Sequence, residues 1–197
     1  MSGFSRTRGV VRSVRLQPDQ SRLAYCLPVV VLTGSPAHLK TFDYVGPYRY
    51  FLTFCTDSRQ RLFVTRERVE LVMVQIERSA AEELFAVIAY CFMPDHVHLL
   101  IEGRCDSSDC RRFINRAKQF SGFHYAKAFG HRLWQRYGFE RVLRDDEATL
   151  SVARYILENP LRARLVQRVD DYPFVGSRVY SLSEILEAAS TTIRRSG

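Results

Sequence analysis

The sequence predicts an α+β fold in which an antiparallel sheet carries helices on one face, followed by a C-terminal helix that bears a tyrosine. Three observations support this class. Apolar residues recur with a period of two in some segments and with a helical period in others. The two kinds of segment alternate in the order β-α-β-β-α-β-α from Tyr48 onward. A turn of Met93, Pro94 and Asp95 joins two adjacent strand-like segments into a hairpin.

The first four elements follow from local patterns. Residues 48–54 (YRYFLTF) are rich in β-forming residues and predict a strand. Thr65 is a typical N-cap, and residues 67–79 place apolar side chains at helical spacing, so a helix is predicted there. Residues 84–92 and 96–102 lie on either side of the Met-Pro-Asp turn and predict the two strands of the hairpin.

A basic amphipathic helix is predicted over residues 110–129, with Gly130 at its end. Residues 133–143 contain a further strand. Polar residues before the basic helix are candidate N-caps, and these are Asp106, Ser107 and Ser108.

The tyrosine-bearing helix is predicted to open at Asp145 and Asp146 and to run through Leu157. Asn159 before Pro160 ends it, because the residue before a proline is pushed out of the α region. The first six elements have the order of the split βαβ, or ferredoxin-like, arrangement. That arrangement gives an antiparallel sheet with helices on one face.

The chain of 197 residues fits one domain with appendages. Residues 1–46 differ in composition from the rest, with one short β-like run at residues 27–32, and predict an N-terminal extension. This extension is either partly disordered or the result of a start codon assigned too far upstream. Residues 47–180 form the predicted domain. Residues 181–197 form a C-terminal helix, centred on residues 183–188, and a polar tail.

Composition and charge limit the class of protein. A hydrophobic content of 46% is enough for an ordinary core. A net charge of +8 and a pI of about 9.5 favour a polyanionic partner. No apolar run approaches the roughly 18 residues that span a bilayer, and a faint resemblance to a signal peptide is rejected because a long polar segment precedes it. The five scattered cysteines predict free thiols in a reducing cytoplasm.

Two histidines, His96 and His98, open the second strand of the hairpin. Side chains alternate along a strand, so both histidines point to one face, about 7 Å apart along the backbone. Two imidazoles at that spacing can converge on one divalent ion, provided that they are neutral, as most are near pH 7. The alternative is a pair of partly buried or surface histidines on a solvated sheet face, and the pattern alone favours that alternative.

Tyr155 and Asn159 are four residues apart and share one face of the last long helix. A tyrosine hydroxyl is a poor nucleophile at its free pKa of about 10, but a metal ion that polarises a phosphate compensates for this. Asn159 could add an amide oxygen to the two imidazoles around Mg²⁺ or Mn²⁺. The alternatives are a tyrosine at the edge of the core and an asparagine that only stops the helix.

Three segments in this order resemble the single-tyrosine HUH (His-hydrophobe-His) transposases, and most closely the REP-associated tyrosine transposases of bacteria. MPDHVHLLIEG resembles the histidine motif, RYILENPLRARLV the tyrosine helix, and LWQRYGFERVLRDDEA the Trp-Gln strand between them. FLTFCTDSRQRLF and DYPFVGSRVY extend the resemblance to about residues 47–180. The chain departs from the family pattern at Asp95, where Asn or Glu is frequent, and at Arg164, where glycine is common.

The resemblance implies a metal-dependent single-strand DNA endonuclease and strand transferase that acts on hairpin-flanked sites, with residues 47–180 as its catalytic domain. Tyr155 would form a 5′-phosphotyrosyl intermediate. His96, His98 and Asn159 would bind Mg²⁺ or Mn²⁺. The protein would be cytoplasmic and nucleoid-associated, without a membrane partner, and a monomer or a homodimer. Polar residues of the basic helix and of the following strand would contact the DNA, and these are Arg111, Arg112, Arg116, Lys118, Gln119, Gln135, Arg136, Arg141 and Arg144.

These expectations have alternatives. The basic helix could simply present a solvated polar face. Trp134, Tyr137 and Phe139 could stack on unpaired bases, although Trp134 is expected in the core. A catalytically silent, domesticated DNA-hairpin-binding protein would keep the fold, but it would not need the histidines, the tyrosine and the asparagine together. An unrelated ferredoxin-like RNA-binding module would carry paired aromatic residues where this chain has histidines.

Overall fold

The computed structural model describes residues 43–136, 138–143 and 149–193. A five-stranded sheet runs through it in the order β4-β1-β3-β2-β5, and all neighbouring strands are antiparallel. The α+β, ferredoxin-like prediction is therefore confirmed, with β5 added at one edge. The strands are β1 (Arg49–Cys55), β2 (Phe85–Met93), β3 (His96–Gly103), β4 (Phe139–Val142) and β5 (Val175–Gly176).

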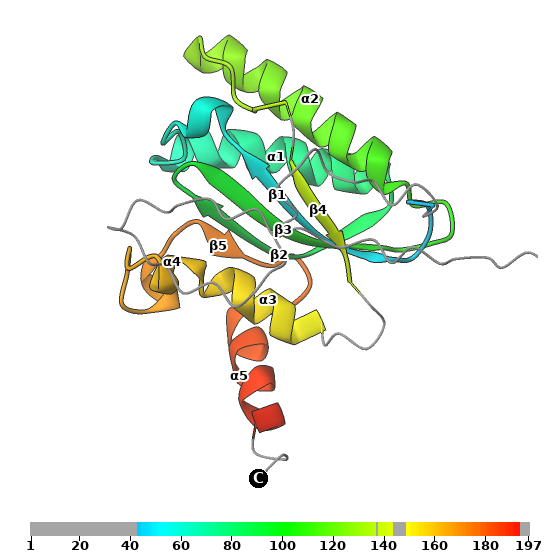
Figure 1. Cartoon of the computed structure of the whole chain (residues 1–197), viewed down its shortest axis with the longest axis vertical. Coiled ribbons are helices and arrows are strands. Elements are labelled where there is room, and N and C mark those ends of the chain that lie inside the picture. Colours follow the sequence, from blue (N-terminus) through cyan, green and yellow to red (C-terminus); the bar gives the residue numbers. More distant parts are fainter. Residues whose placement is uncertain (1–42, 137, 144–148, 194–197) are drawn as a thin grey trace, which may run out of the picture.

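Helices cover both faces of the sheet (Figure 1). The first two pack side by side on one face, and α3 packs against β2 and β3 on the other, with α5 beside it. The prediction that the helices lie on one face of the sheet therefore holds for α1 and α2 only. The helices are α1 (Arg66–Glu82), α2 (Cys110–Phe129), α3 (Thr149–Leu157), α4 (Asn159–Arg162) and α5 (Leu182–Ile193), with 3-10 turns η1 (Asp57–Arg59) and η2 (Val169–Asp171).

Local signals explain where α1 and α2 begin and end. The Thr65 hydroxyl accepts a hydrogen bond from the Arg68 amide, as predicted for an N-cap. For α2 the predicted caps were wrong, because Asp109 fills that position and accepts from the Arg112 amide at 3.0 Å. Ser108 is instead buried and donates to the Leu84 carbonyl at 2.8 Å. Gly130 ends α2 with a φ of 73°, which glycine adopts without strain.

The hairpin of β2 and β3 fixes which residues lie on the α3 face. An extra residue in β2 between Val87 and Ala89 shifts the register, so Cys91 pairs with His98 and Met93 with His96. Cys91 and Met93 belong to the core that α3 covers. The two histidines therefore point toward the α3 side of the sheet.

The remaining predictions concern the end of α3, the segments outside the described residues and the absence of a membrane span. Helix α3 ends at Leu157, close to the predicted stop, but Asn159 is the first residue of α4. The prediction that Pro160 forces Asn159 out of the helical region was therefore wrong, because a proline is tolerated in the first turn of a helix. The predicted opening at Asp145 and Asp146 lies outside the described residues, as do residues 1–42 of the predicted extension with their β-like run. Within the ranges that the structure describes, no helix is long and apolar enough to cross a membrane.

Candidate functional site

The two histidines of β3 converge at the end of the strand nearest the hairpin turn. The Nε2 atoms of His96 and His98 are 3.1 Å apart. Strand pairing places Cys55 of β1 beside His96 and Thr53 beside His98. The shared face predicted from the alternation is therefore present, and both reactive ring nitrogens point to one place.

Each histidine is oriented through its other ring nitrogen. His98 Nδ1 lies 2.8 Å from the Thr53 hydroxyl, and His96 Nδ1 lies 2.7 Å from Asp95 Oδ1. Because an ionised carboxylate only accepts hydrogen bonds, His96 donates from Nδ1 and keeps the lone pair on Nε2. That lone pair accepts the hydrogen bond from His98 Nε2, so the Thr53 hydroxyl donates to His98 Nδ1. Second contacts of this kind fix the ring and its tautomer in metal-binding histidines.

The electrostatics of the site favour neutral imidazole and ionised carboxylate. Burial lowers the pKa of His98 to about 3, and the nearby positive charges of Arg162 and Arg59 act in the same direction. The hydrogen bond from His96 holds the pKa of Asp95 below its usual range, with Arg59 contributing in the same direction. At neutral pH, His98 is therefore a neutral base, as metal ligation requires.

The donor set fits a divalent metal ion in part. Two neighbouring ligands at about 2.0–2.1 Å from an octahedral Mg²⁺ lie about 3 Å apart, close to the Nε2 separation seen here. The side chain of His96 is 16% exposed, so the pair is not sealed from solvent. Among the described residues, no group of three or more His, Cys, Asp or Glu side chains could hold a metal ion. An ion would rest on the two imidazoles and on ligands of another kind.

Asn159 was predicted to supply the third ligand. Its side-chain nitrogen donates to the carbonyl oxygens of Tyr155 and Ile156, each at 3.1 Å. The amide thus connects α4 to the end of α3. Its role as a metal ligand stays a prediction.

Tyr155 lies on the same side of the sheet as the histidine pair. Its ring meets the Phe51 ring edge-on, with centroids 6.4 Å apart, and Phe51 in turn lies 5.4 Å from the His98 ring. The Arg162 guanidinium stacks on the tyrosine ring, 3.9 Å from its centroid, and donates to the Tyr155 carbonyl. Phe51 therefore contacts both the tyrosine ring and the His98 ring, and Arg162 stacks on the tyrosine.

Sequence reasoning missed four residues of this site: Thr53, Asp95, Arg59 and Arg162. Arg162 follows Tyr155 by seven residues, two helical turns, and that spacing could have indicated a shared face. Asp95 directly precedes the histidines and could have been suspected as their partner. Thr53 and Arg59 come from a different segment, and nothing in their local pattern distinguishes them.

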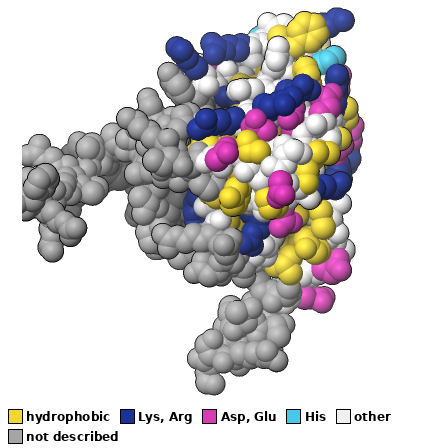
Figure 2. Space-filling model, turned by 90° about the vertical axis from the view of Figure 1, so that its right-hand side faces the viewer, with side chains coloured by type: hydrophobic (Ala, Val, Ile, Leu, Met, Phe, Trp, Pro, Cys, Tyr) yellow, Lys and Arg dark blue, Asp and Glu magenta, His cyan; other side chains and the backbone are white. Residues whose placement is uncertain are grey.

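The basic side chains of α2 that were predicted to contact DNA have partners within the protein. Arg116 pairs with Glu82 and Glu83 at the end of α1, and Arg112 also pairs with Glu83. The Lys118 ammonium donates to the carbonyls of Gln135 and Arg136, while Arg111 stacks on Tyr44 and Gln119 is exposed. Figure 2 shows basic side chains gathered over the upper part of one face, with acidic side chains among and below them. DNA contacts by these residues stay a prediction.

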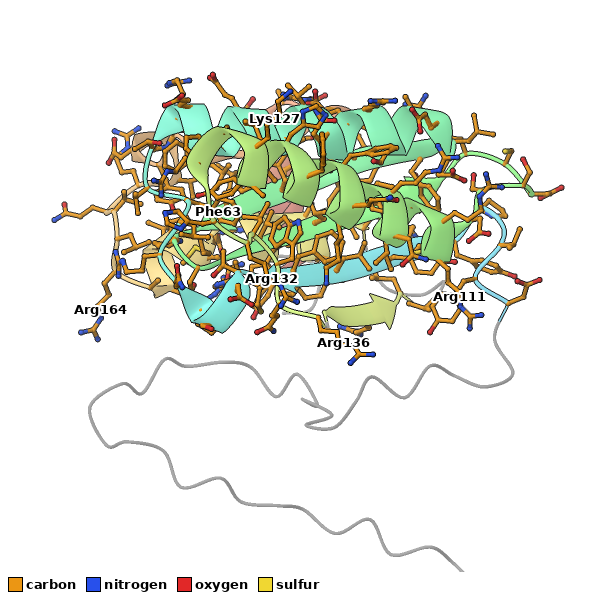
Figure 3. All side chains as sticks on the ribbon, turned by 90° about the horizontal axis from the view of Figure 1, so that it is seen from above. Phe63, Arg111, Lys127, Arg132, Arg136 and Arg164 are labelled. Atoms are coloured by element: carbon orange, nitrogen blue, oxygen red, sulfur yellow. The ribbon has the colours of Figure 1, made fainter. Side chains whose placement is uncertain are left out.

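Three of the remaining DNA candidates, Gln135, Arg136 and Arg141, lie in or just before β4. Gln135 is partly buried and its backbone N–H donates to the Cys55 carbonyl, whereas Arg136 and Arg141 are exposed. Figure 3 shows Arg136 extending outward beside β4, well away from Arg111 at the end of α2. Arg144 and Tyr137 lie outside the described residues. Trp134 is buried and donates to the Ser121 hydroxyl at 2.8 Å, so its predicted place in the core is confirmed.

Comparisons with known proteins place the chain among sequences of one family. The family model described as "Transposase IS200 like" matches residues 45–159. A protein of Haemophilus influenzae named as a REP-associated tyrosine transposase is 25% identical over 144 residues, which cover 67% of this chain and 81% of the relative.

Two solved structures are also similar. A REP-associated tyrosine transposase bound to a REP hairpin has a TM-score of 0.57 and 22% identity, and the match covers 67% of this chain and 78% of the other. A Deinococcus radiodurans protein named as a transposase has a TM-score of 0.44 and 25% identity, over 61% of this chain and 95% of the other.

Proposed function

The chain belongs to the IS200-like transposase family, and on that premise we propose that it is a metal-dependent endonuclease and strand transferase for single-stranded DNA. Its substrate is a single strand that carries a hairpin of the REP type, as suggested by the relatives. The observation that carries the proposal is the pair of Nε2 atoms, 3.1 Å apart, on the same side of the sheet as Tyr155.

Tyr155 is the nucleophile of the proposed reaction. Its oxygen forms a bond to the phosphorus of a phosphodiester while the bond to the 3′ oxygen breaks, and the tyrosine proton is lost as the departing oxygen gains one. The products are a 5′-phosphotyrosyl link and a free 3′-OH. Because the link keeps the bond energy, attack by a later 3′-OH rejoins strands without ATP.

His96 and His98 are the residues that would hold Mg²⁺ or Mn²⁺, and Asn159 is the candidate for a further ligand. A bound ion would neutralise negative charge on the non-bridging phosphate oxygens. Phe51 and Arg162 pack against the tyrosine ring on the histidine side of the sheet, which supports its proposed role as a positioned nucleophile. Such pre-organisation reduces the entropy that the reaction must otherwise lose.

The DNA backbone is expected to lie along exposed basic side chains at the β4 edge of the sheet. Arg136 and Arg141 are exposed at the β4 edge and are our candidates for phosphate contacts. The four described cysteines are free thiols, which suits the reducing cytoplasm in which we propose that the protein acts.

The test is a cleavage assay with labelled single-stranded DNA that carries a hairpin. We expect nicked product in Mg²⁺ or Mn²⁺ and none in EDTA, with His96→Ala and His98→Ala both inactive. Hairpin binding without cleavage under all metal conditions would instead identify a catalytically silent binding protein.

A further inference from the structure

Asp95 lies between a histidine of the site and an arginine from a distant loop. Its Oδ1 accepts from His96 Nδ1 at 2.7 Å, and its Oδ2 lies 3.0 Å from Arg59 Nε. One carboxylate therefore joins the turn before β3 to η1, and the two paired residues, Asp95 and Arg59, are 36 positions apart in the chain.

The loop that supplies Arg59 has an unusual backbone. Ser58 and Arg59 both have positive φ angles, 52° and 56°, a conformation that side chains other than glycine rarely adopt. Thr56 is fully buried below this turn, and its hydroxyl lies 2.7 Å from the Gln60 carbonyl and 2.9 Å from the Asp95 carbonyl. Its amide also donates to the Asp95 carbonyl at 3.0 Å. Backbone strain held in place by its surroundings is frequent at functional sites.

The ion pair of Arg59 and Asp95 is too exposed to contribute much to the stability of the fold. The Arg59 side chain is 52% exposed and that of Asp95 25%, and exposed ion pairs contribute little to folding. Its effect on His96 is more specific. An ionised Asp95 selects the tautomer with hydrogen on Nδ1, and Arg59 stops the carboxylate from rotating away toward water.

We propose that Arg59 and Asp95 form a positioning relay that keeps the His96 Nε2 lone pair directed at the place where His98 Nε2 also points. This inference rests on the proposed metal site. The relay acts through His96 and does not touch the DNA or the reacting atoms. The left-handed backbone at Arg59 is the conformation that brings its guanidinium to Asp95.

The full-length protein allows a test with a matched control. Arg59→Gly removes the guanidinium at a position where glycine suits the backbone, and Asp95→Ala removes the carboxylate. Ser58→Gly makes the same kind of backbone change next to Arg59 without touching the relay. Mn²⁺ binding is measured by electron paramagnetic resonance, thermal unfolding checks the fold, and nitrogen-15 NMR of the metal-free protein reports the His96 tautomer.

We expect Asp95→Ala and Arg59→Gly to weaken Mn²⁺ binding roughly 10- to 100-fold, the usual range for second contacts of metal ligands. Ser58→Gly keeps wild-type affinity, and Arg59→Gly unfolds at the wild-type temperature or above it. In the metal-free wild type, His96 carries its hydrogen on Nδ1, and Asp95→Ala loses this preference.

The failures of the two proposals are distinguishable. Wild-type Mn²⁺ affinity in both relay variants would overturn the relay and leave the metal site intact. Absence of Mn²⁺ binding in the wild type would overturn the metal site, while the tautomer change in Asp95→Ala would still support the relay. A wild-type His96 with its hydrogen on Nε2 would overturn the relay in either case.

Discussion

His98 differs from an ordinary surface histidine in its surroundings. It is packed between Phe51 and His96, and Thr53 occupies one of its ring nitrogens. Burial and the nearby positive charges together disfavour a proton on the ring, so the folded protein holds His98 in its neutral form. An unfolded histidine has a pKa near 6.5, and the difference links protonation to folding.

This linkage predicts a loss of stability in mild acid. Below pH 6.5 the unfolded chain binds a proton that His98 in the folded protein refuses, so stability falls from pH 6.5 downward and is unaffected above it. In EDTA, we expect the wild type to lose up to about 2 kcal/mol between pH 6.5 and pH 5 relative to His98→Gln. Urea unfolding at several pH values measures this, and parallel pH profiles for the two proteins would contradict it.

Arg164 has a positive φ of 56° at a position where the resemblance leads us to expect glycine. A left-handed conformation costs a residue with a side chain about 1–2 kcal/mol, which glycine does not lose. Part of that advantage is offset because glycine has more conformational freedom in the unfolded chain. We expect Arg164→Gly to stabilise the fold by about 0.5–1 kcal/mol. Urea unfolding measures this, with Arg168→Gly as a control at a residue whose backbone is extended. The prediction fails if Arg164→Gly is no more stable than the wild type.

The histidine motif could be predicted from the sequence because period-two alternation fixes a shared face. The partners of that motif could not. Thr53 is 45 residues from His98, and only the pairing of β1 with β3 brings them together. Arg59 reaches Asp95 from a turn in which Ser58 and Arg59 are both left-handed, and neither is a glycine that would have indicated this conformation.

At the scale of elements, α1 and α2 are joined by a cluster of charges. Glu83 has a side chain that is only 5% exposed, and it accepts from Arg116 Nε at 2.8 Å and from Arg112 Nε at 3.3 Å. Glu82, beside it, is more exposed and also pairs with Arg116. A buried carboxylate that loses its charge leaves two guanidinium groups with weaker partners.

We therefore expect Glu83→Gln to destabilise the protein by about 1–3 kcal/mol, the range for a hydrogen bond to a charged group. The more exposed Glu82→Gln should cost clearly less. Chemical unfolding of the two variants measures the difference. Equal effects would show that the buried carboxylate does not hold α2 against α1.

Element types were predictable where caps and periods are local, and boundaries were less so. Thr65 and Gly130 act as predicted, whereas Asn159 and Pro160 begin a new helix directly after α3 ends. The cap of α2 was assigned too early because Ser108 is drawn into a buried bond with Leu84, which leaves Asp109 to cap the helix. The two-residue β5 and the extra residue in β2 depend on tertiary pairing and leave no local signal.

At the scale of the whole molecule, both outer strands of the described sheet are short. β4 has four residues and β5 has two, and short edges offer little backbone for pairing with a second copy. We expect a monomer of about 22.9 kDa in light scattering coupled to gel filtration. A stable species of twice that mass would contradict this and would favour an active site shared between two copies.

The proposed function depends most on one claim, that Tyr155 attacks DNA beside a metal ion held by His96 and His98. The most direct measurement is mass spectrometry of the protein after incubation with hairpin-bearing single-stranded DNA and Mn²⁺, followed by peptide mapping. We predict a covalent nucleotide adduct on Tyr155 that is absent in EDTA and in Tyr155→Phe. An adduct on another residue, or an adduct of equal yield in Tyr155→Phe, would contradict the account.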